Sequence, residues 1–278
     1  MNKEELLKRL EELGRRKNEE WLAGLESRKL EELRFHDKYR DSIRLSKISK
    51  DAYEKIYGNK RFYNTIQLSM DYVQKWLQQH AKGKIFLDYA CGNGINAIRV
   101  AKAGAELAIG VDISDISVKN ARESAYKEGV SDNTYFVQGD CENTGLPANC
   151  IDLAICSGML HHLDLSCALY ELKRILKPSG IVLVIEALNH NPLIRFYRNI
   201  TPQMRTQWEK NHILSYREIA FASRFFDVKD IRHWHLFSVA GAYIPQALPF
   251  LDAVDRIVLR TPILKKMSWM VTFEMHKR

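Results

Sequence analysis

The stretch that decides the fold reads Ile85-Phe86-Leu87-Asp88-Tyr89-Ala90-Cys91-Gly92-Asn93-Gly94. Its apolar beginning predicts a buried strand, and the apolar spacing of a helix follows from Ile95 to Ala103. Between them lies a turn of small residues, where glycines let the backbone pass close to a ligand. Strand, glycine turn and helix in this order predict a ligand-binding crevice at the carboxyl edge of a parallel sheet.

The spacing of the small residues differs from the dinucleotide-binding pattern G-x-G-x-x-G, which disfavours a nicotinamide oxidoreductase. Here the order is Asp88-x-Ala90-x-Gly92-x-Gly94, with an acid before the turn. An acid there repels a pyrophosphate and suits a ligand with an amino group or a sulfonium. The stretch resembles motif I of the class I S-adenosylmethionine-dependent methyltransferases, with Ala90 in place of the first usual glycine. The alternative is a tight turn that binds nothing.

Length and composition suit one large α/β domain with additions. The 278 residues are 46% hydrophobic and 27% charged, both ordinary for a globular protein. No apolar run is long enough to span a membrane, and the amino terminus is charged, unlike a signal peptide. The five cysteines contain no Cys-x-x-Cys pair, so we expect reduced thiols in a cytoplasmic protein and no metal site.

The formal net charge of +8 is compatible with nucleic acid as a partner. However, Lys and Arg are interleaved with Asp and Glu, and neither a long basic run nor a basic-aromatic RNA-binding signature is present. We therefore interpret the charge as a solvated surface with a basic bias, and we disfavour nucleic acid as a partner.

The chain divides into a helical extension or cap at residues 1–80 and a methyltransferase domain at residues 81–278. Within the extension, leucines at three- and four-residue spacing predict a helix over residues 2–40. An aromatic cluster follows, which either covers a ligand or packs the helices onto the sheet: Tyr53, Tyr57, Phe62 and Tyr63.

From residue 85 onward strands and helices alternate, which predicts a parallel sheet. The resemblance implies an α/β, Rossmann-like class I methyltransferase fold, with a mainly parallel seven-stranded sheet and an antiparallel C-terminal strand. Residues 187–214 are irregular and contain two prolines, and we expect them to form a lid insertion. Strand candidates also lie at residues 228–237 and 269–275, with an apolar, proline-punctuated helical region between them.

The resemblance implies a site for S-adenosylmethionine made by Asp88, Ala90, Gly92, Gly94, Asp112, Ile113, Asp140, Cys141 and Ser157. Asp112 lies 18 positions after Gly94, close to the spacing of an acid that binds ribose hydroxyls. A carboxylate there can accept two hydrogen bonds from a vicinal diol. Asp140 resembles the acid that meets the adenine amino group in this family, and Cys141 would pack on the ring. An ordinary surface-loop acid is the alternative for Asp112.

The loop after the fourth expected strand carries Leu-His-His-Leu at residues 160–163. Such a loop is common in small-molecule enzymes of the class. His161 and His162 are candidate general bases, because imidazole titrates near neutral pH and an oxygen acceptor with a high pKa benefits from a base. Purely structural roles for both are the alternative. His212, in the insertion, is a weaker candidate.

Together these features predict methyl transfer from S-adenosylmethionine to a small, partly apolar molecule, with oxygen favoured as the acceptor atom. The alternatives are a nucleic-acid methyltransferase and an inactive binding protein on the same fold; a homo-oligomer is left open. Near the end of the chain, Leu251, Val254 and Val258 share one helix face. That face either packs on the sheet edge or meets a membrane surface or a lipophilic acceptor.

Overall fold

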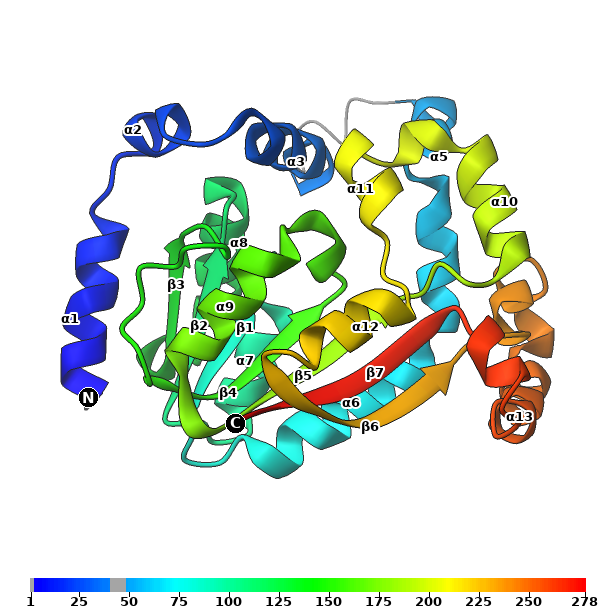
Figure 1. Ribbon diagram of the computed structural model, residues 1–278. Helices are drawn as coiled ribbons and strands as arrows, with labels where there is room; N and C mark the ends of the chain where they lie inside the picture. The colour runs from blue at the N-terminus through cyan, green and yellow to red at the C-terminus, as the bar shows by residue number, and fades with distance from the viewer. Residues whose placement is uncertain (1–2, 41–48) are drawn as a thin grey trace.

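One seven-stranded sheet forms the centre of the computed structural model, which describes residues 3–40 and 49–278 (Figure 1). The strands are β1 (Ile85–Tyr89), β2 (Leu107–Asp112), β3 (Thr134–Gln138), β4 (Ile151–Ser157), β5 (Leu176–Ala187), β6 (Phe226–Trp234) and β7 (Met270–Lys277). They lie in the order β3-β2-β1-β4-β5-β7-β6. β7 is antiparallel to both neighbours, whereas the pairs among β1 to β5 are parallel. The expected fold class is confirmed.

Helices cover both faces of this sheet (Figure 1). The α-helices are α1 (Lys3–Gly14), α2 (Asn18–Ala23), α3 (Ser27–Arg40), α5 (Lys50–Tyr57), α6 (Gln67–His80), α7 (Ile95–Lys102), α8 (Asp115–Lys127), α9 (Leu165–Ile175), α10 (Pro192–Ile200), α11 (Gln207–His212), α12 (Tyr216–Ala222) and α13 (Leu248–Val258). The 3-10 helices are η1 (Gly58–Thr65), η2 (Ser131–Asn133), η3 (Leu160–His162), η4 (Pro202–Met204), η5 (Ser238–Ala242), η6 (Pro245–Ala247) and η7 (Leu264–Met267).

Two apolar clusters fix the helices to the sheet. One joins the buried leucines of α1, Leu6 and Leu10, to the apolar sides of α9 and α12. The other joins Val73 and Trp76 of α6 to α7 and α8 on the opposite face. Each fully buried leucine contributes about 1.5–3 kcal/mol relative to exposure, so α1 is held firmly to the domain.

The chain reverses its strand order at β1, and this places the site. β1 pairs with β2 on one side and with β4 on the other, with Asp88 opposite Gly110 and Ile155. At such a switch point, the loops that leave the carboxyl ends of neighbouring strands diverge to opposite faces and leave a crevice between them. The loops after β1 and β4 both begin at this crevice.

The amino-terminal region differs from the single helix expected over residues 2–40. It forms α1, α2 and α3, and Gly14 and Gly24 lie at the breaks between them. Glycine costs about 1 kcal/mol relative to alanine in a helix interior, and it is frequent at helix ends. The leucine spacing is correct for α1, whose Leu6, Leu10 and Leu13 are buried.

The expected irregular insertion at residues 187–214 contains two α-helices instead. Asn191 caps α10 by accepting hydrogen bonds from the backbone N–H groups of Leu193 and Ile194, and Pro192 follows at the first helical position. Thr206 caps α11. These cap residues were readable in the sequence, because asparagine or threonine before a helix and proline at its first position are helix-start signals.

The region between β6 and β7 is divided among η5, η6, α13 and η7, in line with the proline-punctuated helical region expected there. Pro245 begins η6, and Pro262 lies just beyond α13, because proline cannot donate a helix-interior hydrogen bond. Among residues 3–40 and 49–278, no helix combines the length and the apolar character needed to cross a membrane.

Candidate functional site

A cavity of about 310 Å³ lies at the carboxyl ends of β1, β2 and β4. We call it the sheet-edge cavity. Eight of the nine residues expected to bind S-adenosylmethionine line it: Asp88, Ala90, Gly92, Asp112, Ile113, Asp140, Cys141 and Ser157. They come from four different strands or their following loops, and the parallel sheet brings them together. The ninth, Gly94, is not part of the wall.

Gly94 has a packing role at the start of α7. Its φ is 77°, in the left-handed region, and a Cβ there would lie 2.7 Å from the Phe136 ring and 2.8 Å from the Ala121 Cβ. A side chain at this position would therefore push α7 away from β3 and α8. Ala90 also has a left-handed φ, 59°, which explains why glycine is usual at its position in the family motif.

Asp88 is fully buried and holds the first turn of α7. Its Oδ2 accepts a hydrogen bond of 3.2 Å from the backbone N–H of Ala97, and its Oδ1 accepts one of 3.4 Å from the side-chain amide of Asn96. Burial raises the pKa of this carboxyl to about 7, although both hydrogen bonds act in the opposite direction. The acid before the turn thus fixes strand, turn and helix relative to one another.

Asp112 connects the glycine turn to the end of β2. Its Oδ2 accepts a hydrogen bond of 2.7 Å from the backbone N–H of Gly92, and its Oδ1 accepts one of 3.0 Å from that of Ser114. The Arg40 guanidinium lies 3.0 Å from Oδ1. The carboxylate therefore sits on the cavity wall, held in one orientation by donors from three segments.

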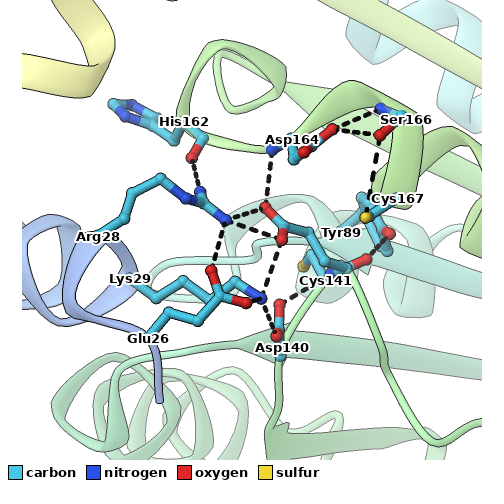
Figure 2. A network of polar contacts seen from close by, with 11 residues as sticks. Glu26, Arg28, Lys29, Tyr89, Asp140, Cys141, His162, Asp164, Ser166 and Cys167 are labelled. Atoms are coloured by element: carbon cyan, nitrogen blue, oxygen red, sulfur yellow. Dashed lines mark hydrogen bonds and ion pairs between the residues drawn. The ribbon is translucent and has the colours of Figure 1, made fainter.

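Helix α3 lies over the sheet-edge cavity, as ion pairs from its first turn indicate (Figure 2). Lys29 Nζ lies 2.7 Å from Asp140 Oδ2 and 2.9 Å from Glu142 Oε2, and Arg28 binds both oxygens of Glu142 at 2.7 and 2.8 Å. Burial would lower the pKa of Lys29, but the hydrogen bonds and charges of Asp140 and Glu142 raise it.

The sequence interpretation missed this helix as part of the cavity wall. Arg28, Glu32, His36 and Arg40 all line the cavity, and they follow one another at four-residue intervals. Side chains spaced by four lie on one helix face, so the pattern was a usable signal. Sequence alone could not say which face of the sheet this helix would meet.

The two candidate histidines face different cavities. His162 lines the sheet-edge cavity, and its Nδ1 lies 2.8 Å from Glu32 Oε2 of α3. His161 lines a second cavity, and its Nδ1 lies 2.8 Å from Glu186 Oε2 at the end of β5. The two rings are 4.1 Å apart. The η3 loop therefore forms part of the wall of both cavities.

Glu186 holds His161 in place. The other Glu186 oxygen accepts hydrogen bonds of 2.7 and 2.6 Å from the backbone N–H groups of Met159 and Leu160. Burial lowers the pKa of His161, but the charge and hydrogen bond of Glu186 outweigh it, and the pKa is raised above its ordinary value. With Nδ1 engaged, Nε2 is the ring nitrogen that is able to reach a molecule in the second cavity.

The second cavity, which we call the aromatic cavity, has a volume of about 280 Å³. Its walls come from η1, η3, the 187–214 segment, η5 and the residue before β7. The lining residues are Asn59, Phe62, Tyr63, His161, Ala187, Leu193, Ile194, Tyr197, Arg198, Arg205, Glu209, Ile213, Val239, Tyr243 and Trp269. Phe62 and Tyr63 of the expected aromatic cluster are among them, whereas Tyr53 and Tyr57 pack against each other at 5.3 Å.

The weaker candidate, His212, lines neither of these two cavities. It is exposed and stacks on Trp208 with ring centroids 3.7 Å apart. In the part of the chain that the structure describes, one group has metal-ligand character: Glu32, His36 and His162, with ligand atoms within 4.8 Å of one another. Glu32 Oε2 lies between the two histidines, 2.8 Å from His162 Nδ1 and 3.6 Å from His36 Nε2.

Comparison with known proteins gives a family match for the central part of the chain. A family model described as "Methyltransferase domain" matches residues 87–184. Over 104 residues the chain is 36% identical to ribosomal protein arginine N-methyltransferase rmt3 of Schizosaccharomyces pombe, covering 36% of this chain and 19% of that one. Over 99 residues it is 34% identical to 27-O-demethylrifamycin SV methyltransferase of Amycolatopsis mediterranei, covering 35% and 36%. The match thus spans about a third or less of these relatives' length.

Solved structures share the fold. Geranyl diphosphate C-methyltransferase from Streptomyces coelicolor A3(2) superposes with a TM-score of 0.56 at 14% identity, covering 75% of this chain and 76% of that one. The cyclase SpnF gives 0.54 at 21%, covering 74% and 80%. At these identities the likeness speaks for the fold alone. The chain therefore has the class I methyltransferase fold, and its residues 87–184 match the methyltransferase-domain model.

Proposed function

We propose that this protein transfers a methyl group from S-adenosylmethionine to a small, partly apolar molecule, with oxygen as the favoured acceptor atom. The observation that carries the proposal is the η3 loop, on which His162 lines the sheet-edge cavity and His161 lines the aromatic cavity. A transferase of this kind needs cofactor and acceptor in adjoining spaces, with a proton acceptor on the acceptor side.

The sheet-edge cavity fits S-adenosylmethionine chemically. Asp112 and Asp140 line it with carboxylates that would accept hydrogen bonds from ribose hydroxyls and an adenine amino group, and Cys141 and Ile113 would give apolar contact. When bound, the cofactor supplies a methyl group already activated on a sulfonium. The protein's own task is then to position both reactants and to exclude water.

On the acceptor side, His161 takes the proton from an acceptor hydroxyl at Nε2, and Glu186 stabilises the imidazolium that results. The aromatic walls exclude water around the acceptor. The 187–214 segment supplies eight of the lining residues, and we propose that it acts as the lid of this cavity. The relative that acts on rifamycin is consistent with a small-molecule acceptor.

Calorimetry with the intact protein tests the cofactor assignment. We expect S-adenosylhomocysteine to bind and NAD to give no heat of binding. Binding of NAD in preference, or failure of both S-adenosylmethionine and S-adenosylhomocysteine to bind, would contradict the proposal. The cyclase SpnF shares this fold, so the fold alone does not prove methyl transfer. The second measurement is therefore the transfer of a labelled methyl group to a product, which distinguishes a methyltransferase from an inactive binding protein.

We also propose that the protein contacts an anionic membrane surface near the opening of the aromatic cavity. Leu193 and Phe196 of α10 are 78% and 65% exposed, and Phe250 and Ile257 of α13 are 70% and 68% exposed. Leu251, Val254 and Val258, which the sequence singled out, lie instead on the half-buried side of α13. Exposed basic residues accompany the apolar ones: Arg195, Arg256, Arg260 and Lys266.

Vesicle sedimentation tests this contact. The protein should co-sediment with phosphatidylserine-containing vesicles at low salt. The double variant Phe250→Glu/Ile257→Glu should bind about 10²–10⁴-fold less, since each of the two apolar side chains contributes about 1.5–3 kcal/mol when buried. Tyr126→Glu, at an 81% exposed tyrosine of α8, is the matched control and should bind normally. Equal binding by both variants, or no sedimentation of the unaltered protein, would rule out the contact.

A further inference from the structure

The aromatic cavity contains two guanidinium groups and one carboxylate in its wall. These belong to Arg198 of α10, Arg205 after η4, and Glu209 of α11. Arg205 Nε lies 3.5 Å from Glu209 Oε1, and the two side chains are only 7% and 15% exposed. This ion pair uses the single carboxylate that lines the cavity.

Arg198 is held by neutral groups. Its Nη1 donates to the backbone carbonyl of Leu188 at 3.0 Å and to the side-chain oxygen of Asn189 at 3.4 Å. Burial, and then the charge of Arg205, lower the pKa of Arg198 to about 10, and the guanidinium stays protonated at neutral pH. In the described part of the chain no carboxylate forms an ion pair with this partly buried guanidinium, and the charge of Glu209 acts on it only at longer range. The wall therefore favours a ligand that brings a further negative charge.

The remainder of the wall is apolar and aromatic. The Phe62 ring lies 5.2 Å from Tyr197, 5.8 Å from Tyr243 and 6.3 Å from Trp269, all in edge-to-face arrangements. Leu193, Ile194 and Val239 extend this surface. Such a lining suits the flat or branched body of a hydrophobic molecule. Among the lining residues, the two arginines are the permanently charged partners for an acidic group.

His161 lies in the same wall, and the charges of Glu209 and Arg198 both act on it. A ligand anchored by its acid at the guanidinium groups is thus held with another part of its body near the Nε2 atom of His161. Arginine binds carboxylates and phosphates through two parallel hydrogen bonds, which fixes orientation as well as affinity.

We propose that the acceptor is an amphiphilic acid, with an aromatic or branched apolar body and one carboxylate or phosphate group that binds Arg198, with Arg205 beside it. This inference rests on the proposed function, since it names the class of acceptor for the aromatic cavity. Arg198 acts by binding and orienting the acceptor, and His161 remains the group that handles its proton.

Three probes of one shape test the proposal: 3-phenylpropionate, 3-phenylpropyl phosphate and the neutral 3-phenylpropanol. Their affinities are measured by calorimetry with the protein saturated in S-adenosylhomocysteine. We expect at least one acid to bind roughly 10- to 100-fold more tightly than the alcohol, as a charge-assisted hydrogen bond implies. The tighter of the two acids identifies the head group as carboxylate or phosphate.

Arg198→Met should remove the preference for the acid while leaving alcohol binding and S-adenosylhomocysteine binding unchanged. Arg195→Met, on the exposed side of the same helix, is the matched control and should keep the preference. Equal affinities for acids and alcohol in the unaltered protein, including no binding of any probe, would overturn the proposal even if Arg198→Met fails to fold. If the unaltered protein does not bind S-adenosylhomocysteine, the proposed function itself is refuted.

Discussion

Replacing His161 with alanine is expected to lower the methyl-transfer rate constant by about 10²–10⁴-fold, the usual contribution of a positioned general base. The reason is geometric, because Glu186 engages Nδ1 at 2.8 Å and leaves Nε2 for the acceptor. S-adenosylhomocysteine binding should be unchanged, since His161 lines the aromatic cavity and not the sheet-edge cavity.

The pH dependence of methyl transfer tests whether His161 acts as a base. A base works as neutral imidazole, and the Glu186 carboxylate raises the pKa of His161 above its ordinary value. Activity should therefore fall as the pH is lowered through that raised pKa, and this acid limb should disappear from the residual activity of His161→Ala. A pH profile of the maximal rate measures it.

Glu186→Gln tests whether His161 needs the Glu186 carboxylate in order to act as a base. The glutamine amide would donate a hydrogen bond to Nδ1, which forces the neutral imidazole to carry its proton on Nε2, the wrong side for a base. We expect a loss of rate close to that of His161→Ala, and no further loss in the double variant, because the two side chains act as one unit.

His212→Ala is the control for histidine removal. His212 is exposed and stacked on Trp208, outside both cavities, so this variant should keep nearly full activity. Full activity of His161→Ala, or additive losses in the double variant, would show that the acceptor loses its proton to some other group or needs no base.

Local sequence signals predicted the sheet and the sheet-edge cavity well. The run ending at Asp88, the glycine turn and the acids at the ends of the next strands lie near one another because parallel strands finish at one edge. Ser114 and Ser215 cap α8 and α12, and serine before a helix is a local start signal. These features depend on neighbours in the chain, which is why periodicity and cap chemistry suffice to find them.

The aromatic cavity and the α3 contacts depend on residues far apart in the chain. Arg28 and Lys29 meet Glu142 and Asp140 across more than a hundred positions, and no local period encodes such a pairing. Glu186 is different, since it directly ends the apolar run of β5. A glutamate at the end of an apolar strand, next in order after the strand that leads into the His-His loop, was a usable signal. The sequence interpretation did not use it.

The structure also ties α3 to the expected lid segment. Glu32 of α3 accepts a hydrogen bond from the Thr206 hydroxyl, and the Arg28 guanidinium lies 4.4 Å above the Trp208 ring. Figure 1 shows α3 and α11 side by side above the sheet. Helix α3 thus contacts the wall of the sheet-edge cavity through Lys29 and Arg40. It also contacts α11 and its cap residue, and α11 carries Glu209 of the aromatic cavity.

Asp112→Ala is expected to weaken S-adenosylhomocysteine binding by about 10²–10⁴-fold, because two hydrogen bonds from ribose hydroxyls to a carboxylate contribute about 1.5–3 kcal/mol each. Part of the loss arises within the protein, since the backbone N–H groups of Gly92 and Ser114 also lose their acceptor. Asp112→Asn keeps a side-chain oxygen for them, so it should lose less affinity. Calorimetry on both variants separates the two contributions.

Arg40→Met tests the same carboxylate by removing its ion-pair partner, and here the affinity is expected to rise. The Arg40 guanidinium lies 3.0 Å from Asp112 Oδ1, in a position where it competes with the ribose for that oxygen. Without it, S-adenosylhomocysteine no longer has to displace an ion pair, and affinity should rise several-fold relative to the unaltered protein. If Arg40→Met instead weakens binding as much as Asp112→Ala, then Arg40 holds the ligand rather than competing with it. In that case α3 would be part of the cofactor site itself, closing over the bound molecule with its charges in place.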